Sequence, residues 1–467
     1  PGLKQVRRST LPTASSRNHK TCWVTGTRAG AWTRHLRGLL PGQSAPVSWL
    51  PGACPTGDRL LAALAKKGPN RQVPERGSER TRMALDAQRE NISTQPGSRP
   101  ARVRIDGGML EGGGQLLRNS CALAAIKRVP IEVFNIRAGR AKPGLKPQHK
   151  TGIAIIADVC NGSVENVHDG STTIRLDPGG IVTGSHVGDT KTAGSCTLLA
   201  QATLPVLLYA QPTDSTPISK LEFRGGTDAA LAPPVGYLQH VLVPLLRARL
   251  GLEVEVELVR RGFYPRGGGI MKLNVKPLEL GVPIPPVDLT NRGEITMITI
   301  HAFAAGRLLN KQQDIALAAL TDLRNALGPA VRIQQHIVAE TQTTAKDSGA
   351  GALVIAETDT GCILGGTAGV EKHQPAAAAG SQAAREVIDA IQSGCCVDTW
   401  MQDQMIIFMA LAKGKSRMRC TEPTLHSRTA MVLAEMMIGC KFTVHKPREN
   451  GDQCWVVECQ GADLTRS

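Results

Sequence analysis

The sequence predicts an α/β protein of the α+β type, with mixed rather than purely parallel sheets, from about residue 102 onward. Short β-type runs alternate there with longer helical patterns, which is the order typical of α/β units. The runs 253–259 and 270–275 are joined by a turn rich in glycine and proline, which favours an antiparallel pair. Recurring glycine clusters also indicate an internal repeat. They lie at 112–114, 225–226, 267–269 and 365–366.

The expected elements follow in order along this part of the chain. Strands are expected at 131–136, 172–176, 221–223, 252–258 and 270–275. Helices are expected at 115–126, 152–160, 195–208 and 235–250. The strand runs are short and rich in β-formers, whereas the helix runs are longer and apolar at helical spacing.

A proline-rich joint at 280–292 separates a smaller α/β insert from the main body. Within the insert, strands are expected at 295–302, 330–338 and 352–357 and helices at 313–327 and 380–392. We therefore expect a large domain formed by 102–284 and 391–462, and an insert domain at 285–390.

Residues 1–101 differ in composition from the rest of the chain. They are rich in Arg, Pro, Gly and Ser without sustained periodicity, so we expect them to be disordered. The chain starts at a proline and its first methionine is Met83. The segment is therefore either an Arg-rich targeting peptide or translated upstream sequence. The second interpretation is favoured because no clear amphipathic helix is present.

Most of the positive charge lies in the same segment. The chain holds 55 Lys+Arg and 39 Asp+Glu, a formal net charge of +16. Residues 1–100 hold 17 of the basic and 5 of the acidic residues, which leaves a net charge of only +4 for the remainder. The main body must therefore bind any polyanion through a local patch rather than through its overall field.

The twelve cysteines show no CxxC pair and no regular spacing, and most lie in apolar runs. Buried free thiols in a reducing compartment are expected, and a zinc site is not supported. No stretch of the chain approaches the roughly 20 apolar residues of a membrane-spanning helix, so no membrane partner is expected.

Three glycines precede a predicted helix in the segment Glu111-Gly-Gly-Gly-Gln115-Leu-Leu-Arg118. Backbone N–H groups at such a turn can approach an anion, and the positive end of the helix dipole favours negative charge. The alternative is an ordinary tight turn followed by a solvated arginine.

A cationic loop without acidic residues follows at 137–149. Its cations are Arg137, Arg140, Lys142 and Lys146. Because arginine forks match phosphate oxygens in pairs, this loop predicts phosphate binding. Gln148 and His149 at its end could contact a sugar or base, although His149 could equally be a simple helix-start residue.

Two later segments carry further candidates. Trp400 precedes two amides and a carboxylate, those of Gln402, Gln404 and Asp403. Such a group could hold a purine by stacking and hydrogen bonding, against the alternative of a buried tryptophan at a helix start. His426 lies between a proline-bounded turn and a helical run, although a lone histidine is more often structural. The sequence contains no P-loop, serine-hydrolase elbow or HExxH motif.

Together and in this order, these segments resemble the RNA 3′-terminal phosphate cyclase family. The resemblance covers about residues 102–462 and rests on eight motifs in register. They are DGGMLEGGGQLLR, IRAGRAKPGLKPQH, DTKTAGS, FRGGTDAALAP, RGFYPRGGG, AETDTGCILGG, QDQMIIFMALA and TLHSRTA.

The resemblance implies three repeated βαβαββ-like units, each like the C-terminal domain of bacterial initiation factor three, interrupted by a small α/β insert. It implies conversion of an RNA 3′-terminal phosphate to a 2′,3′-cyclic phosphate, with ATP and a divalent cation, Mg²⁺ or Mn²⁺. A histidine takes up AMP, AMP passes to the RNA phosphate, and the neighbouring 2′-OH closes the ring. RNA with a 3′-phosphate end is therefore the expected partner, and DNA is not expected to cyclise.

The resemblance also implies roles for single residues. His426 matches the family's adenylated histidine. The positions around the phosphates and the RNA end are Glu111, Arg118, Arg137, Arg140, Gln148 and His149, with Glu111 the candidate metal ligand. The adenylate-binding positions are Gln201, Pro233, Trp400, Asp403 and Gln404, where Trp400 replaces the usual tyrosine. Lys191 and Arg266 are left without a definite role.

Two alternatives stay open. Cyclase-like ribosome-assembly factors keep the fold but lack the nucleophilic histidine, and the presence of His426 favours the enzyme over them. An enolpyruvyl-transferase relative would lack an RNA-directed loop, whereas the loop at 137–149 is present. We expect the protein in the nucleus, with the cytosol as the alternative.

Overall fold

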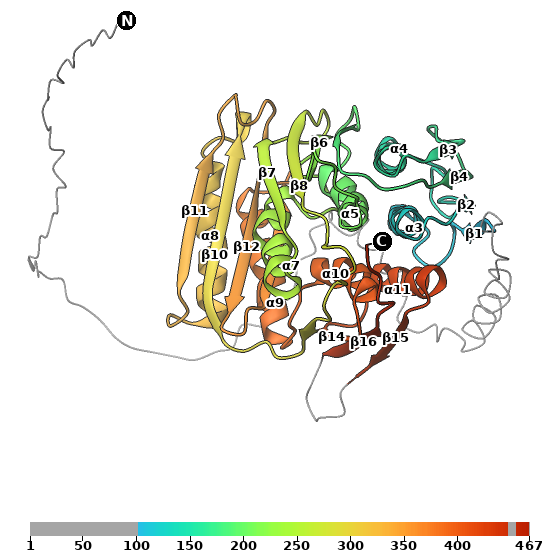
Figure 1. Cartoon of the computed structure of the whole chain (residues 1–467). Helices are drawn as coiled ribbons and strands as arrows, with labels where there is room; N and C mark the ends of the chain where they lie inside the picture. The colour runs from blue at the N-terminus through green and yellow to red at the C-terminus, as the bar shows by residue number, and fades with distance from the viewer. Residues whose placement is uncertain (1–100, 447–453, 467) are drawn as a thin grey trace, which may run out of the picture. The chain divides into compact units, whose positions relative to one another are not determined.

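The computed structural model describes residues 101–446 and 454–466. The disorder expected for the N-terminal extension and the start expected at Met83 lie outside the described residues. In the described part, helices and strands form four groups, each with one four-stranded sheet (Figure 1). The α/β class with mixed sheets is thereby confirmed. None of the described helices combines the length and apolar character needed to cross a membrane.

The first two groups share one topology. The first is β1 (Val103–Asp106), α3 (Gly114–Lys127), β2 (Ile131–Phe134), α4 (Pro147–Val159), β3 (Ser163–Glu165) and β4 (Ile174–Asp177). The second is β5 (Ser185–Asp189), α5 (Cys196–Leu207), β6 (Ser219–Gly225), a helix formed by α6 (Val235–Tyr237), the π turn η2 (Leu238–Leu242) and α7 (Val243–Leu250), then β7 (Val254–Arg260) and β8 (Gly269–Val275). The first two strands of each group pair in parallel, and the last two join them antiparallel. The expected β7–β8 pair is confirmed.

The third group repeats this topology but is interrupted. It consists of β9 (Asp288–Leu289), α10 (Thr399–Leu411), β14 (Lys415–Cys420), α11 (Leu425–Ile438), β15 (Lys441–His445) and β16 (Trp455–Gln460). Its sheet order is β9-β14-β16-β15, with β9 parallel to β14 and the other pairs antiparallel. The three βαβαββ units implied by the resemblance are therefore present.

The insert enters the third repeat between its first strand and its first helix. The sequence-based boundary at 285 assigns Asp288–Leu289 to the insert, whereas these residues pair with Arg417–Met418 of β14. A two-residue strand after three prolines shows no periodicity, so the sequence could not reveal it.

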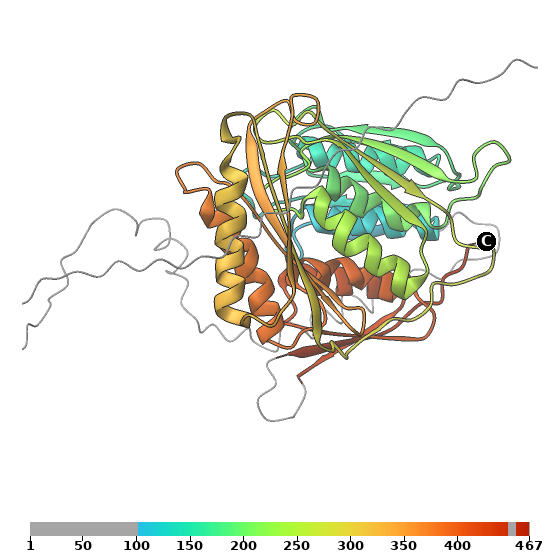
Figure 2. The ribbon, with the colours of Figure 1, turned by 90° about the vertical axis from the view of Figure 1, so that its left-hand side faces the viewer.

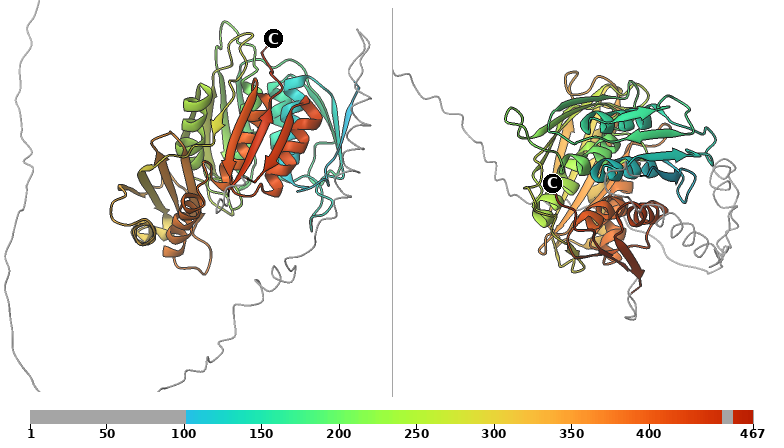
Figure 3. Two further views of the ribbon diagram at one scale, coloured as in Figure 1. Left: turned by 90° about the horizontal axis from the view of Figure 1, so that it is seen from below. Right: turned by 45° about the vertical axis from the view of Figure 1, so that its right-hand side comes forward.

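The insert has its own sheet and its own core. Its elements are β10 (Ile295–Ala305), the 3₁₀ turn η3 (Gly306–Leu308), α8 (Lys311–Leu327), β11 (Ile333–Ala339), β12 (Gly349–Thr358), β13 (Ile363–Gly369) and α9 (Ala377–Gln392). Alternate residues of β10 from Ile298 to Ala304 pack in a cluster with residues of α8 and α9. Helix α8 lies along this sheet (Figure 2). Leu353 and Ile355 on β12 belong instead to the core of the main body. The insert lies to one side of that body (Figure 3).

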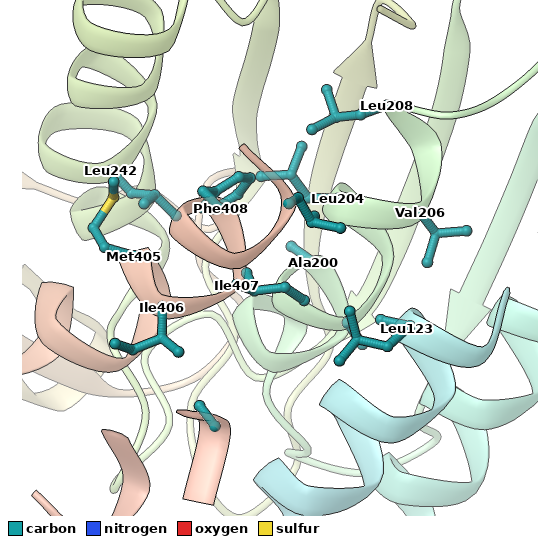
Figure 4. Packing of buried hydrophobic residues seen from close by; sticks show 14 of the residues in the cluster. Leu123, Ala200, Leu204, Val206, Leu208, Leu242, Met405, Ile406, Ile407 and Phe408 are labelled. Carbon is teal, nitrogen blue, oxygen red and sulfur yellow. The ribbon is translucent and has the colours of Figure 1, made fainter. Parts of the chain in front are cut away.

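Helices from all three repeats pack together in the main core. Leu204 of α5, Leu242 of η2 and Phe408 of α10 point toward one another (Figure 4). Helix α3 packs against α4, α5 and α11. This packing brings helices from different repeats into contact. Four of the predicted site residues lie in the first turns of such helices, Gln148 and His149 in α4, Trp400 in α10 and His426 in α11. The ten cysteines of the described chain are buried free thiols, as expected.

Candidate active site

The turn before α3 brings backbone close to side chains of the next helix. Gly112 has a positive φ of 57°. A Cβ at Gly114 would lie 2.5 Å from Nε2 of His149, so only glycine allows this approach. Within the described chain, no side chain hydrogen-bonds as a cap to the start of α3. The first N–H groups of α3 can therefore serve an anion, as the glycine turn predicted.

A pocket of about 410 Å³ opens at this turn. It is lined by Glu111, Gly113, Gly114, Arg137, Arg140, Lys146, Pro147, Gln148, His149, Thr192 and Gly194. Its walls come from the first and second repeats, and its size suits a nucleotide-sized ligand. Five of the six residues predicted to surround the phosphates line it. The sixth, Arg118, lies behind it and lines two smaller cavities.

Glu111 and Arg140 form an ion pair at the mouth of the pocket. Nη2 of Arg140 lies 2.5 Å from Oε1 of Glu111 and donates to the Glu111 carbonyl at 3.1 Å. The other carboxylate oxygen, Oε2, is buried without a hydrogen-bond partner among the described residues. Such an atom is costly unless a ligand satisfies it, and carboxylate oxygen is the donor that Mg²⁺ and Mn²⁺ prefer.

Glu111 therefore fits the candidate metal ligand. Among the described residues, no group of three or more His, Cys, Asp or Glu side chains could enclose a metal ion. A cation at Glu111 would take its other ligands from phosphate oxygens and water, which is the usual arrangement for Mg²⁺.

The guanidinium of Arg137 donates hydrogen bonds to its own loop. Its Nη1 donates to the carbonyls of Lys142 and Gly144 at 2.8 and 2.9 Å. Burial lowers the pKa of Arg137, and the nearby charge of Arg140 lowers it further. The side chain thus stabilises the cationic loop as well as lining the pocket, and its role as a phosphate ligand stays a prediction.

Gln148 and His149 accept hydrogen bonds from the residues that precede α5 and α4. Oε1 of Gln148 accepts the N–H of Ser195 at 3.1 Å, which joins α4 to the start of α5. Nδ1 of His149 accepts the N–H of Lys146 at 3.2 Å, so the neutral ring carries its proton on Nε2, toward Gly114. Burial, and then the charges of Arg118, Arg137 and Lys146, lowers the pKa of His149 to about 3. His149 is therefore a neutral donor at physiological pH.

His426 belongs to a hydrogen-bonded chain of three side chains. Nδ1 of His426 lies 2.5 Å from Oε1 of Gln115, and Nε2 of Gln115 donates to Oδ2 of Asp403 at 2.8 Å. Because the amide donates to the carboxylate, its oxygen faces the histidine. The Nδ1 atom of His426 then carries the proton, and the lone pair lies on Nε2. The exposed ring can offer that lone pair to a ligand.

The charged groups next to these three hydrogen-bonded side chains, Asp403 and Arg118, are buried. Burial raises the pKa of Asp403 to about 6, against the opposing effects of Arg118, His426 and the Gln115 hydrogen bond. Burial also lowers the pKa of Arg118, while Asp403 and Glu111 raise it. Arg118 thus balances two carboxylates at once.

Gln115 is the functional residue that sequence reasoning missed. It stood in the glycine motif without an assigned role, although a polar residue at the buried start of an apolar helix was an available signal. Its partners lie 288 and 311 residues away along the chain. Local pattern could not connect them.

Three of the five predicted adenylate-binding residues meet at one small cavity. Gln201, Asp403 and Gln404 line a space of about 30 Å³. Oε1 of Gln404 is buried without a hydrogen-bond partner in the described chain, while its Nε2 donates to the Trp400 carbonyl at 2.7 Å. The space holds no more than a water molecule or two, so a purine would have to open it.

Trp400 and Pro233 lie elsewhere. Nε1 of Trp400 donates to Oε2 of Glu386 on α9 at 3.2 Å. The Trp400 ring lines a separate cavity of about 250 Å³ with Glu386 and Asp398. The carbonyl of Pro233 accepts the hydroxyl of Thr197 at 2.7 Å. The structure therefore does not bring these two residues to the cavity that holds Gln201.

Comparison with known proteins identifies similar chains. A family model described as RNA 3′-terminal phosphate cyclase matches residues 109–444, a span that includes every predicted site residue. The RNA 3′-terminal phosphate cyclase of Pyrobaculum neutrophilum is 36% identical over 360 residues, which cover 77% of this chain and 98% of that protein. The protein of the same name from Drosophila melanogaster is 38% identical over 360 residues, or 77% of this chain and 96% of that one. A probable RNA 3′-terminal phosphate cyclase of Dictyostelium discoideum is 33% identical over 369 residues, 77% of this chain and 82% of its own.

Proposed function

Because the chain belongs to the RNA 3′-terminal phosphate cyclase family, we propose that it uses ATP to convert an RNA 3′-terminal phosphate to a 2′,3′-cyclic phosphate. The observation that carries this proposal is the pair of hydrogen bonds that joins His426, at the start of α11, through Gln115 to Asp403. It leaves Nε2 of an exposed histidine unprotonated and free to act as a nucleophile.

The first step would form a bond between His426 and AMP. Nε2 of His426 attacks the α-phosphorus of ATP, the N–P bond forms, and the bond to the departing pyrophosphate breaks. The ring gains positive charge as this happens. Oε1 of Gln115 accepts a hydrogen bond from Nδ1–H throughout, and the Asp403 carboxylate behind Gln115 stabilises the charged ring.

The next two steps would take place in the cationic pocket. An oxygen of the RNA 3′-phosphate attacks the phosphorus held on His426, which frees the histidine and leaves AMP joined to the RNA phosphate. The neighbouring 2′-OH then attacks the 3′-phosphorus, its proton passes to water, and the bond to AMP breaks. AMP is a far better leaving group than oxide. Arg140, Lys146 and the start of α3 would bind the phosphate oxygens, and Nε2–H of His149 would donate to them.

ATP and a divalent cation are part of the proposal. Glu111 would hold the cation through Oε2, and the cation would neutralise phosphate charge. Gln201 and Gln404 would bind the adenosine once their cavity opens, with Oε1 of Gln404 ready to accept a hydrogen bond. Trp400 would have to leave Glu386 in order to stack on the base.

The non-catalytic alternative, a cyclase-like ribosome-assembly factor, is disfavoured by the same observation. A protein with no nucleophile has no need for a histidine whose tautomer is set by two further side chains. A nuclear location, expected from the resemblance, remains part of the proposal.

Labelling with ATP tests the proposed function directly. The full chain, supplied with Mg²⁺ or Mn²⁺ and α-³²P-ATP, is expected to retain label on a denaturing gel. The bond should be labile in acid and stable in alkali, as a phosphoramidate is. His426→Ala should lose the label, whereas the control His445→Ala, at an exposed histidine on β15, should keep it.

A chase with RNA completes the experiment. RNA ending in a 3′-phosphate should remove the label and become cyclic, while the same RNA with a terminal 2′-deoxyribose should not cyclise. An unlabelled wild-type protein, or equal labelling of His426→Ala, would contradict the proposal.

A further inference from the structure

One aromatic ring in the described chain is exposed without a structural reason. Tyr264 is 82% exposed, whereas Tyr209 and Tyr237 are buried. All other Phe, Tyr and Trp side chains that the structure describes are at least partly buried. The ring of Tyr264 therefore contributes little to the core, and its function has to be sought at the surface.

The loop that carries Tyr264, residues 262–268 between β7 and β8, is held on one side by a small apolar cluster. Phe263 lies in this cluster with Phe303 and Ala345 of the insert, and the two phenyl ring centroids are 6.3 Å apart. The neighbouring backbone is bonded as well, because Arg261 donates its N–H to the carbonyl of Thr344 at 2.7 Å.

The other side of the loop packs against the wall of the cationic pocket. Gly267 has a φ of 72°, and a Cβ there would lie 2.4 Å from the carbonyl oxygen of Thr192. Thr192 lines the pocket together with Gly194. The N–H of Gly226 donates to Gly194, and that of Thr227 donates to Gly262, at 2.8 and 2.9 Å. Tyr264 is thus exposed on a loop that is held at both ends and that packs against Thr192 of the pocket wall through Gly267.

Two exposed cationic side chains lie in this loop or next to the residue that it contacts. Arg266 is 80% exposed, and its ion pair with Asp347 is long at 3.3 Å. Lys191 is 81% exposed beside Thr192 and pairs with Asp189 at 2.8 Å. Exposed pairs of this kind contribute little energy, so both cations can turn to a phosphate backbone at small cost.

We propose that loop 262–268 is a second RNA-binding site, in which the ring of Tyr264 stacks on a base upstream of the 3′-terminal nucleotide and Arg266 binds an adjacent phosphate. This inference rests on the proposed function, since it takes RNA as the ligand of the cationic pocket. Single-stranded RNA fits the chemistry, because every base has a face for stacking and every linkage carries a negative charge. The site would favour oligonucleotides over mononucleotides with little regard to sequence.

Equilibrium binding without ATP tests the site apart from catalysis. A fluorescent 3′-phosphorylated RNA oligonucleotide should bind Tyr264→Ala at least about fivefold more weakly than wild type, the loss typical of one stacked base. Tyr264→Trp should restore binding. Leu317→Ala, an exposed apolar residue on α8, is the matched control and should bind as wild type.

Abasic RNA sites identify the base that stacks. Removing one upstream base should weaken binding to wild type but not to Tyr264→Ala, because the interaction is already lost. Arg266→Ala should reduce the slope of log affinity against log salt by about 0.7, the value for one phosphate contact on a single strand. In cyclisation, Tyr264→Ala should raise KM while leaving kcat unchanged.

Two outcomes overturn this inference. Equal RNA affinity of Tyr264→Ala and wild type would do so, and so would abasic sites that cost the same in both proteins, as expected if Tyr264 instead docks another protein. If wild type still labels His426 and cyclises RNA in those cases, only the second site is wrong. A wild-type protein that binds no RNA overturns both this site and the proposed function.

Discussion

The joint between insert and body and the candidate active site both contain buried polar side chains, but they differ in how many polar atoms have partners. At the joint, Asp398 accepts the hydroxyl of Tyr237 at 2.7 and 2.8 Å and the N–H of Gly365 at 2.7 Å. It also caps α10 by accepting the N–H groups of Trp400 and Met401 at 2.8 and 2.9 Å. One carboxylate thus joins three parts of the chain.

Asp403 lies five residues further along the same helix and accepts a side-chain hydrogen bond from Gln115. Near it, Oε2 of Glu111 and Oε1 of Gln404 are buried without partners among the described residues. Burial raises the pKa of both Asp398 and Asp403 to about 6, so the pKa does not separate the two regions. The two regions differ instead in buried oxygens that lack a hydrogen-bond partner, and these oxygens indicate where a ligand would bind.

The strongest test exchanges each aspartate for asparagine. Asp398→Asn should lower the free energy of unfolding by about 3 kcal/mol, because an amide nitrogen cannot accept from the donors around it. Asp403→Asn can still accept from Gln115, so its stability should change by less than about 1 kcal/mol. Its self-adenylation should slow by about 100-fold, since the charge behind His426 is lost. Urea denaturation and label uptake from ATP measure the two effects.

The distinction between the joint and the active site would be wrong if the two variants had the same effects on stability and self-adenylation. In particular, an Asp398→Asn protein that is stable but adenylates itself slowly would show that Asp398 contributes to catalysis. Refolding controls and the urea m-value distinguish lost stability from a changed unfolding transition.

A second test distinguishes a structural role from a ligand-binding role for two arginines of the cationic loop. Arg137→Ala should destabilise the loop by about 1–2 kcal/mol, because the carbonyls of Lys142 and Gly144 lose their donor. Arg140→Ala leaves the bonds to the loop carbonyls intact and removes only the contact with Glu111 at the pocket mouth. It should therefore raise KM for RNA about tenfold while hydrogen exchange in the loop stays as in wild type. Hydrogen exchange across 137–146 and steady-state cyclisation measure these effects.

Rescue separates the two arginine roles further. Arg140→Lys should recover part of the RNA affinity, since a point charge still binds phosphate. Equal loop protection in Arg137→Ala and wild type would show that the Arg137 contacts contribute nothing to the loop.

The smallest effect concerns pH and His149. Its folded pKa of about 3 lies below the ordinary value of 6.5, so acid adds a proton to the unfolded chain before the folded one. Stability should therefore fall as the pH drops through the window from 6.5 to 3. Between pH 7 and 6, wild type should lose about 0.7 kcal/mol more than His149→Gln, which cannot titrate. Parallel stability curves for the two proteins would contradict the neutral, buried state of His149.

Much of the site could be predicted from sequence because its signals are local. The glycine turn at 112–114, the cationic loop and the helix that begins at Leu425 are each short patterns whose geometry follows from nearby residues. The structure brings Glu111, Arg140 and His149 to one pocket, as the order of motifs predicted. The orientations of Trp400 and Arg137 depend on Glu386 and on loop carbonyls, which no motif encodes.

By itself, the sequence determined the α/β class and the order of elements, which follow from periodicity and turn chemistry. Local charge marked the cationic loop at 137–149, and the family resemblance implied the other site residues. The tertiary structure alone decided that Gln115 joins His426 to Asp403, that β9 belongs to the third repeat, and that the loop of Tyr264 packs against the pocket wall through Gly267. Each of these depends on contacts between distant segments, and only the packed helices and sheets determine which distant segments meet.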